Sequence, residues 1–271
     1  MNWTEEILDL PHGPVRTQSL GEGPVFLWTH GVFHPIDVDD FTPVPRALAS
    51  LRGWRVVRYD TRGHGRTPAA GTDEAHRWDR LGEELLQLAD ALGAERFAAG
   101  GISMGAAVSL HAAVRRPDRV QALALLAPPT GWETRPPQLD GYRALAALGS
   151  PEKVAEHIGA DLERDLGSFG ISDSLRRMVE GIRLADWTGL GRVLRAAAES
   201  DLPAKEDVAR LELPAVVLPW ENDAGHPLET ARAIAERLPH AELRIVQGVE
   251  DADAIRAGIQ QALDAALART R

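Results

Sequence analysis

The stretch "FAAGGISMGAAVSL", from Phe97 to Leu110, decides the fold. Its apolar first half predicts a buried strand, and the run after Ser103 predicts a helix. Between them, the five residues GISMG form a GxSxG turn, in which glycines let strand and helix pack closely. The start of the helix directs N–H groups at the serine hydroxyl, which favours a developing oxyanion. Ser103 is therefore a candidate nucleophile on a strand–turn–helix unit.

Similar apolar runs alternate with helical patterns along much of the chain. The expected strands are 14–20, 24–30, 54–60, 96–102, 120–127, 215–220 and 242–248. The amphipathic stretches that separate or follow them are 77–93, 104–116, 228–238 and 254–268. This alternation predicts an α/β fold with a mainly parallel sheet covered by helices on both faces. The first two runs, joined by "GEGP", are expected to form an antiparallel start.

One segment interrupts the alternation. Residues 128–213 contain helical patterns broken by Gly, Ser and Pro, and no convincing strand. We interpret residues 128–213 as a helical cap inserted into a core domain made of residues 1–127 and 214–271. Inserted segments of this kind commonly shape a pocket.

The composition narrows the class of protein. A net charge of −10 argues against nucleic acid and anionic membrane surfaces as partners. With no cysteine, the chain has no disulfide, thiolate metal site or cysteine nucleophile. Neither metal-ligand spacing nor a GxGxxG phosphate loop after a strand is present, so no metal or cofactor is expected. The acidic start lacks a signal-peptide pattern, and no apolar run reaches the roughly 20 residues that cross a bilayer. These features indicate a cytoplasmic protein with a small-molecule substrate, and they leave its oligomeric state open.

Two further motifs extend the pattern of the serine turn. "THGVF" at residues 29–33 follows the second expected strand, and "YDTRGHGRT" at 59–67 follows the third. In this order and spacing, the three motifs resemble the α/β-hydrolase superfamily, and the resemblance covers nearly the whole chain. The capped branch that hydrolyses small lactones, esters and carbon–carbon bonds is the most similar. This resemblance implies an α/β-hydrolase fold with an eight-stranded sheet and a helical cap after the sixth strand.

The resemblance also implies roles for particular residues. Ser103 matches the nucleophile, and the amides of Val32 and Met104 match the oxyanion donors. In "PWENDAGHP" after the seventh strand, Asp223 matches the catalytic acid, and Trp220 stands where the family usually has glycine. Three further positions match residues with a structural role in the family: His30, Asp60 and His64.

The general base departs from the family pattern. The family carries a histidine just after the last strand, but here that place reads "IVQGVEDADAIRAGI". The nine histidines are His12, His30, His34, His64, His76, His111, His157, His226 and His240. None follows His240, which itself precedes the last strand. Glu250 or Asp251 occupies the position of the missing base.

Three candidates could accept the serine proton. His226, three residues after Asp223, is the leading one, because a catalytic triad is defined by geometry and not by chain order. His34, just past the oxyanion loop (residues 30–32, which carry the Val32 amide), is the second, with a substrate contact as its alternative role. Glu250 and Asp251 form the third, although "EDAD" is better explained as the cap of the last helix.

Aromatic residues and one carboxylate complete the candidate site. We expect Phe33, His34, Trp132 and Trp220 to line the substrate pocket, with core packing as the alternative for each tryptophan. Glu133, after the sixth strand, is a further possible site residue, although its segment is better explained as the start of the cap.

The sequence thus favours a serine hydrolase of a small ester or lactone with a displaced base. A binding module that has lost its base is the alternative from another class. A non-hydrolytic lyase or cyclase on the same scaffold is the third hypothesis, because fold alone does not set function.

Overall fold

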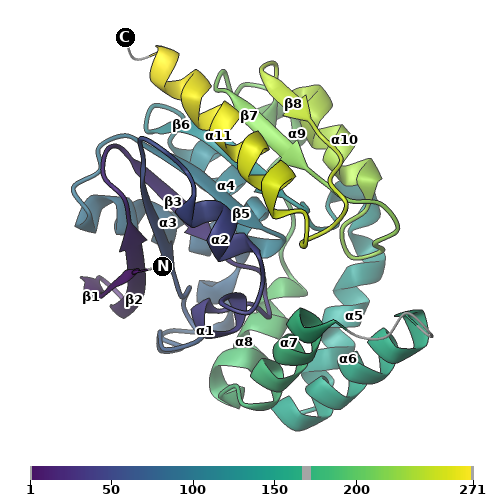
Figure 1. The fold of residues 1–271 in the computed structure, drawn as a ribbon. Helices are drawn as coiled ribbons and strands as arrows, with labels where there is room; N and C mark the ends of the chain where they lie inside the picture. The colour runs from purple at the N-terminus through teal and green to yellow at the C-terminus, as the bar shows by residue number, and fades with distance from the viewer. Residues whose placement is uncertain (1, 167–171, 270–271) are drawn as a thin grey trace.

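The computed structural model describes residues 2–166 and 172–269, and an eight-stranded sheet forms its centre (Figure 1). The strand order is β1-β2-β4-β3-β5-β6-β7-β8, and the strands from β4 to β8 run parallel. The strands are β1 (Thr4–Leu10), β2 (Gly13–Leu20), β3 (Val25–Thr29), β4 (Arg55–Tyr59), β5 (Phe97–Ile102), β6 (Val120–Leu126), β7 (Ala215–Leu218) and β8 (Ala241–Leu243). This sheet confirms the predicted α/β-hydrolase fold.

The central strands are apolar on both faces because helices cover both sides of the sheet. In β3, Val25 and Leu27 pack into one hydrophobic cluster, while Phe26 and Trp28 pack into a second cluster on the opposite face. Successive side chains of a strand point to opposite faces, so an unbroken apolar run fills two cores.

Helices α3 and α4 contribute to the first cluster, and α2 and α11 contribute to the second. Helices α2 and α11 lie in front of the sheet in Figure 1. The helices outside residues 128–213 are α1 (Ile36–Asp39), α2 (Val44–Ala49), η1 (Asp73–His76), α3 (Trp78–Ala91), α4 (Met104–Arg115), α10 (Leu228–Arg237) and α11 (Ala252–Arg269). The four long amphipathic stretches of the sequence correspond to α3, α4, α10 and α11.

The chain between β6 and β7 contains helices and loops wherever the structure describes it. Its elements are η2 (Trp132–Thr134), α5 (Pro136–Ala147), α6 (Pro151–Leu166), α7 (Asp173–Arg183), α8 (Trp187–Ala197) and α9 (Lys205–Val208). Helices α5 to α8 gather beyond one end of the sheet (Figure 1). We propose that residues 128–213 act as a cap over this end.

The strands at the two edges of the sheet differ from those expected from the sequence. Strand β1 lies in the acidic start and pairs with β2, yet most of its residues are exposed, so it lacks an apolar pattern. Strand β2 is antiparallel to β4, and β4 lies between β2 and β3, so the first two apolar runs are not neighbours. Strand β8 ends at Leu243, well before Gly248. Pro219 opposite has no N–H with which to continue the ladder.

Candidate active site

Ser103 occupies a strained turn between β5 and α4. Its φ of 54° and ψ of −117° lie in a region that side-chain-bearing residues rarely adopt. A Cβ at Gly101 or Gly105 would collide with the carbonyl oxygen of Thr29 on the neighbouring strand. Both flanking glycines are therefore required by close backbone contact, as the GxSxG pattern predicted.

His226 reaches the serine from the loop after β7. Its Nε2 lies 2.9 Å from Ser103 Oγ, and its Nδ1 lies 2.8 Å from Asp223 Oδ2. Each distance is that of a hydrogen bond, so the three side chains form a continuous hydrogen-bonded chain. The side chains of His226 and Asp223 are 24% and 28% exposed, which leaves the pair accessible. The structure thus brings Ser103 of the GxSxG turn together with Asp223 and His226 of the loop after β7.

The loop after β7 holds the Asp223 carboxylate from several directions. Oδ1 accepts the backbone N–H groups of Gly225 at 2.9 Å and His226 at 3.2 Å. Oδ2 accepts the Trp220 indole N–H at 2.7 Å as well as the His226 imidazole. Burial acts to raise the pKa of Asp223, but these hydrogen bonds and the charge of His226 outweigh it and hold that pKa well below its ordinary value.

The predicted oxyanion donors lie beside the serine. The N–H groups of Ala106 and Ala107 donate to the Ser103 carbonyl, so the amide of Met104 precedes the first intrahelical hydrogen bond of α4. Gly31 packs against the serine, because a Cβ built on it would lie 3.5 Å from Ser103 Cβ. The loop carrying Val32 therefore passes close to the Ser103 side chain.

Two buried histidines hold this oxyanion loop. The amide of Thr61 donates to His30 Nε2 at 3.1 Å, so His30 Nδ1 carries the proton and donates to the Gly31 carbonyl at 2.7 Å. His64 Nε2 lies 3.0 Å from the Val32 carbonyl oxygen. Burial lowers the pKa of His30 to about 4 and that of His64 to about 3, so both are neutral at pH 7. This geometry agrees with the structural role expected for both residues.

Asp60 likewise supports the backbone around the site. Its Oδ1 accepts the amide of Ile36 at 2.8 Å, and its Oδ2 accepts that of Arg66 at 3.0 Å. The carboxylate thus joins two loops and agrees with the structural role that the sequence indicated.

A cavity of about 480 Å³ lies between the oxyanion loop and helices α7 and α8. Val32 and Phe33 line it from the loop, and Ile182 and Leu190 line it from the helices. Phe33 lies on the wall of this cavity, which charged side chains such as Asp37 and Arg177 also line, whereas Ser103 and His226 are not among its lining residues.

The other residues expected in the pocket take different positions. His34 packs near Gly31, and burial together with the charge of nearby His226 lowers its pKa to about 4. Trp220 contacts Asp223 instead of lining the cavity. Trp132 donates its indole N–H to the Pro203 carbonyl at 2.8 Å, and its ring faces Lys205, so it too lies outside the cavity lining.

The acidic candidates have partners away from the serine. Asp251 Oδ1 accepts the amide of Ala254 at 3.3 Å and so caps α11. Glu250 accepts a hydrogen bond from the Ser174 hydroxyl at 3.3 Å, and Glu133 forms an ion pair with Lys205. The capping explanation of "EDAD" therefore agrees with the structure better than a role as base.

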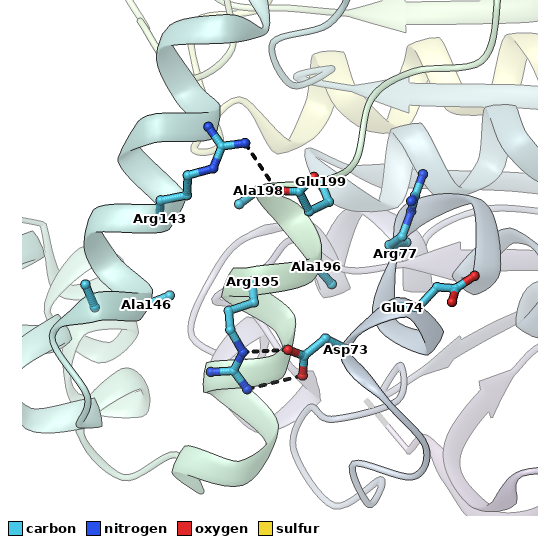
Figure 2. Close-up of a pocket in the computed structure, with 10 residues that line it drawn as sticks. Asp73, Glu74, Arg77, Arg143, Ala146, Arg195, Ala196, Ala198 and Glu199 are labelled. Atoms are coloured by element: carbon cyan, nitrogen blue, oxygen red, sulfur yellow. Dashed lines mark hydrogen bonds and ion pairs between the residues drawn. The ribbon is translucent and has the colours of Figure 1, made fainter.

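A second cavity, of about 670 Å³, is bordered by η1, α5 and α8 (Figure 2). Four of its charged side chains pair with one another: Arg195 Nε lies 2.6 Å from Asp73 Oδ2, and an Arg143 nitrogen lies 3.2 Å from a Glu199 carboxylate oxygen. Its lining includes no residue of the oxyanion loop, whereas Val32 lines the smaller cavity. The smaller cavity beside the oxyanion loop is therefore the better candidate for a substrate pocket.

Within residues 2–166 and 172–269, no cluster of three histidines, cysteines or carboxylates could hold a metal ion. No helix in these same ranges combines the length and apolar character that crossing a membrane requires.

Residues 24–252 match the family described as alpha/beta hydrolase fold, so the chain belongs to this family. It is 28% identical over 205 residues to the putative carbamate hydrolase RutD of Caulobacter sp. (strain K31), covering 74% of this chain and 75% of that protein. It is 31% identical over 204 residues to the pimeloyl-[acyl-carrier protein] methyl ester esterase of Aromatoleum aromaticum (strain DSM 19018 / LMG 30748 / EbN1), covering 70% and 78% of the two chains.

The fold is also similar to the crystal structure of a hydrolase from Pseudomonas aeruginosa PA01, with a TM-score of 0.79 and 24% identity. This similarity covers 96% of this chain and 98% of that one. The relatives are hydrolases, which favours an enzyme of the same broad class.

Proposed function

We propose that this protein is a serine hydrolase of a small ester or lactone. The observation that carries the proposal is the hydrogen-bonded chain Ser103–His226–Asp223, with 2.9 Å and 2.8 Å between its members. An ester is a natural target, since one relative is a pimeloyl-[acyl-carrier protein] methyl ester esterase.

In the proposed acylation, Ser103 Oγ attacks the substrate carbonyl carbon as its proton passes to His226 Nε2. The amides of Val32 and Met104 stabilise the negative charge on the carbonyl oxygen. The protonated imidazole then gives its proton to the leaving alcohol oxygen, the carbon–oxygen bond breaks, and an acyl-enzyme remains.

In deacylation, water attacks the acyl carbon while His226 accepts one of its protons. The tetrahedral intermediate collapses, the bond to Ser103 breaks, and the proton returns to the serine oxygen, which releases the acid. Asp223 remains ionised throughout because its pKa is held low, so it stabilises the imidazolium without taking the proton. For a lactone, the acid and alcohol leave as one hydroxy acid.

The cavity beside the oxyanion loop supports a small substrate. Phe33, Ile182 and Leu190 offer apolar surface beside the oxyanion loop, and small-molecule pockets typically combine such walls with a few polar groups.

A fluorophosphonate probe tests the proposal, because it phosphonylates an activated serine. We expect mass spectrometry to find the adduct on Ser103, and Ser103→Ala to abolish it. Hydrolysis of p-nitrophenyl acetate and butyrate by the same preparation provides the activity readout. A folded protein that neither labels nor hydrolyses either ester would refute the proposal and favour a binding module.

A further inference from the structure

Trp220 occupies a position in the loop after β7 that the substrate pocket does not explain. Its ring is partly buried and packs against the hydrophobic cluster that contains α11. The indole N–H points at Asp223 Oδ2 at 2.7 Å. The ring also meets the His226 imidazole edge to face, with centroids 5.9 Å apart and planes at 64°. One anchored side chain therefore contacts both partners of Ser103.

The indole and the imidazole share a single carboxylate oxygen. Asp223 Oδ2 accepts Trp220 Nε1 at 2.7 Å and His226 Nδ1 at 2.8 Å, while Oδ1 accepts backbone N–H groups. Rotation of the carboxylate about its terminal bond would break these contacts together. The indole thus fixes the plane in which Oδ2 faces the imidazole.

Asp223 and His226 lie only three residues apart on the loop after β7. Their relative position is therefore not fixed by two different strands of the sheet. The sheet core anchors the Trp220 ring, and the ring in turn holds the carboxylate that orients His226. The hydrogen bond from the indole also draws charge from Oδ2, which weakens the stabilisation of a protonated imidazole.

We propose that Trp220 is a positioning residue that holds the Asp223–His226 pair in its working geometry and tunes its proton affinity. The inference rests on the proposed function, because it assigns Trp220 a role in the reaction that His226 assists. Glycine, which the resemblance leads one to expect at this position, offers no donor to do this.

Trp220→Phe tests the inference, because it keeps an aromatic ring and removes the N–H. We expect kcat for p-nitrophenyl butyrate to fall about tenfold, the effect of losing a well-placed hydrogen bond to a charged group, while KM changes little. With less charge drawn from Oδ2, the imidazolium is stabilised, so the acid limb of the pH–kcat profile should move to higher pH. A purely structural role would leave this limb in place.

Trp132→Phe is the matched control, since it also removes an indole hydrogen bond from a partly buried ring, here one made to the Pro203 carbonyl. We expect its kcat and acid limb to equal those of the wild type. Thermal unfolding of both variants shows whether a lost activity reflects lost folding.

The outcomes separate the two proposals. If wild type labels at Ser103 while Trp220→Phe keeps both kcat and the acid limb, the positioning role is refuted and the proposed function stands. A fall in kcat with no movement of the acid limb would also refute the tuning of the pair. If folded wild type neither labels nor turns over, the proposed function itself fails.

Discussion

The loops after β7 and β8 leave neighbouring parallel strands at the same edge of the sheet, but only one of them reaches Ser103. The first carries Asp223 and His226 in hydrogen-bonded sequence toward the serine. The second, where the family pattern places the base, contains Asp251 as a helix cap and Glu250 bonded to Ser174. Because adjacent carboxyl ends share one edge, a base can come from either loop. The comparison teaches that the site is set by position in space and not by order along the chain.

Removing the His226 imidazole should have the largest effect and tests which of the two loops supplies the base. We expect His226→Ala to lower kcat/KM for p-nitrophenyl butyrate by about 10³-fold or more, since the serine then has no group to take its proton. The rate of fluorophosphonate labelling should fall in parallel. Glu250→Gln is the control from the other loop and should keep activity within about twofold. The reverse result, an active His226→Ala and an inactive Glu250→Gln, would place the base after β8.

Neutralising the acid should have the next largest effect. Asp223→Asn preserves the size of the side chain but removes the charge that stabilises the imidazolium, so we expect kcat to fall about 10³-fold. KM should change little, because Asp223 contacts His226 and not the cavity. Steady-state kinetics at pH 8 provide the measurement. Activity close to wild type in this variant would mean that His226 needs no orienting partner.

Glu84, a carboxylate remote from this loop, has a pKa shifted in the opposite direction to that of Asp223. Asp223 is held ionised, whereas burial raises the pKa of Glu84 to about 7, against the opposing effect of Arg62. A folded pKa above the unfolded value favours folding below about pH 4.5, and this contribution is lost as pH rises through 7. A shift of this size corresponds to on the order of 3 kcal/mol.

Glu84→Gln should therefore remove a pH-dependent loss of stability. Relative to wild type, the free energy of unfolding of the variant should increase, so the variant becomes the more stable of the two, as pH rises from 5 to 8. Urea unfolding across this range measures the difference. A difference that stays constant with pH would show that Glu84 titrates alike in the folded and unfolded chains.

The smallest expected effect concerns the cap of α11. Asp251→Ala removes the side-chain acceptor for the Ala254 amide and should lower the free energy of unfolding by about 1 kcal/mol. Esterase activity should be unchanged, because the contacts of this carboxylate lie within its own loop and helix. Chemical denaturation with parallel kinetics tests both statements. A large loss of kcat at full folding would return Asp251 to the list of candidate bases.

Most of the fold could be predicted because strong apolar runs are local signals. The buried strands β3, β5 and β6 and the helix α4 follow from continuous apolar stretches and from the glycines around Ser103. Strand β1 cannot be predicted from apolar patterning, because most of its residues are exposed and it is held by pairing with β2. Strand β8 ends early opposite Pro219, the residue after β7, which has no N–H to donate. Pairing between strands cannot be predicted from the sequence of either segment alone.

The candidate site was likewise predictable only in part. The serine turn, the oxyanion loop and Asp223 were found from motifs, and His226 was a candidate because of its nearness to Asp223. Trp220 was expected in the pocket wall, yet its indole turned to the carboxylate, and Trp132 turned to the Pro203 carbonyl. The direction of a tryptophan ring depends on the side chains packed around it, which the flanking sequence does not specify.

The amino-acid sequence fixes which chemical groups are available: one serine on a glycine-flanked turn, an aspartate after the apolar run 215–220, and no histidine after the last apolar run. Local backbone preference and residue type suffice for that. Only the tertiary structure decided which histidine meets the serine, because the 2.9 Å contact joins residues 123 positions apart. The parallel sheet creates that contact by bringing the carboxyl ends of β5 and β7 to one edge, on either side of β6.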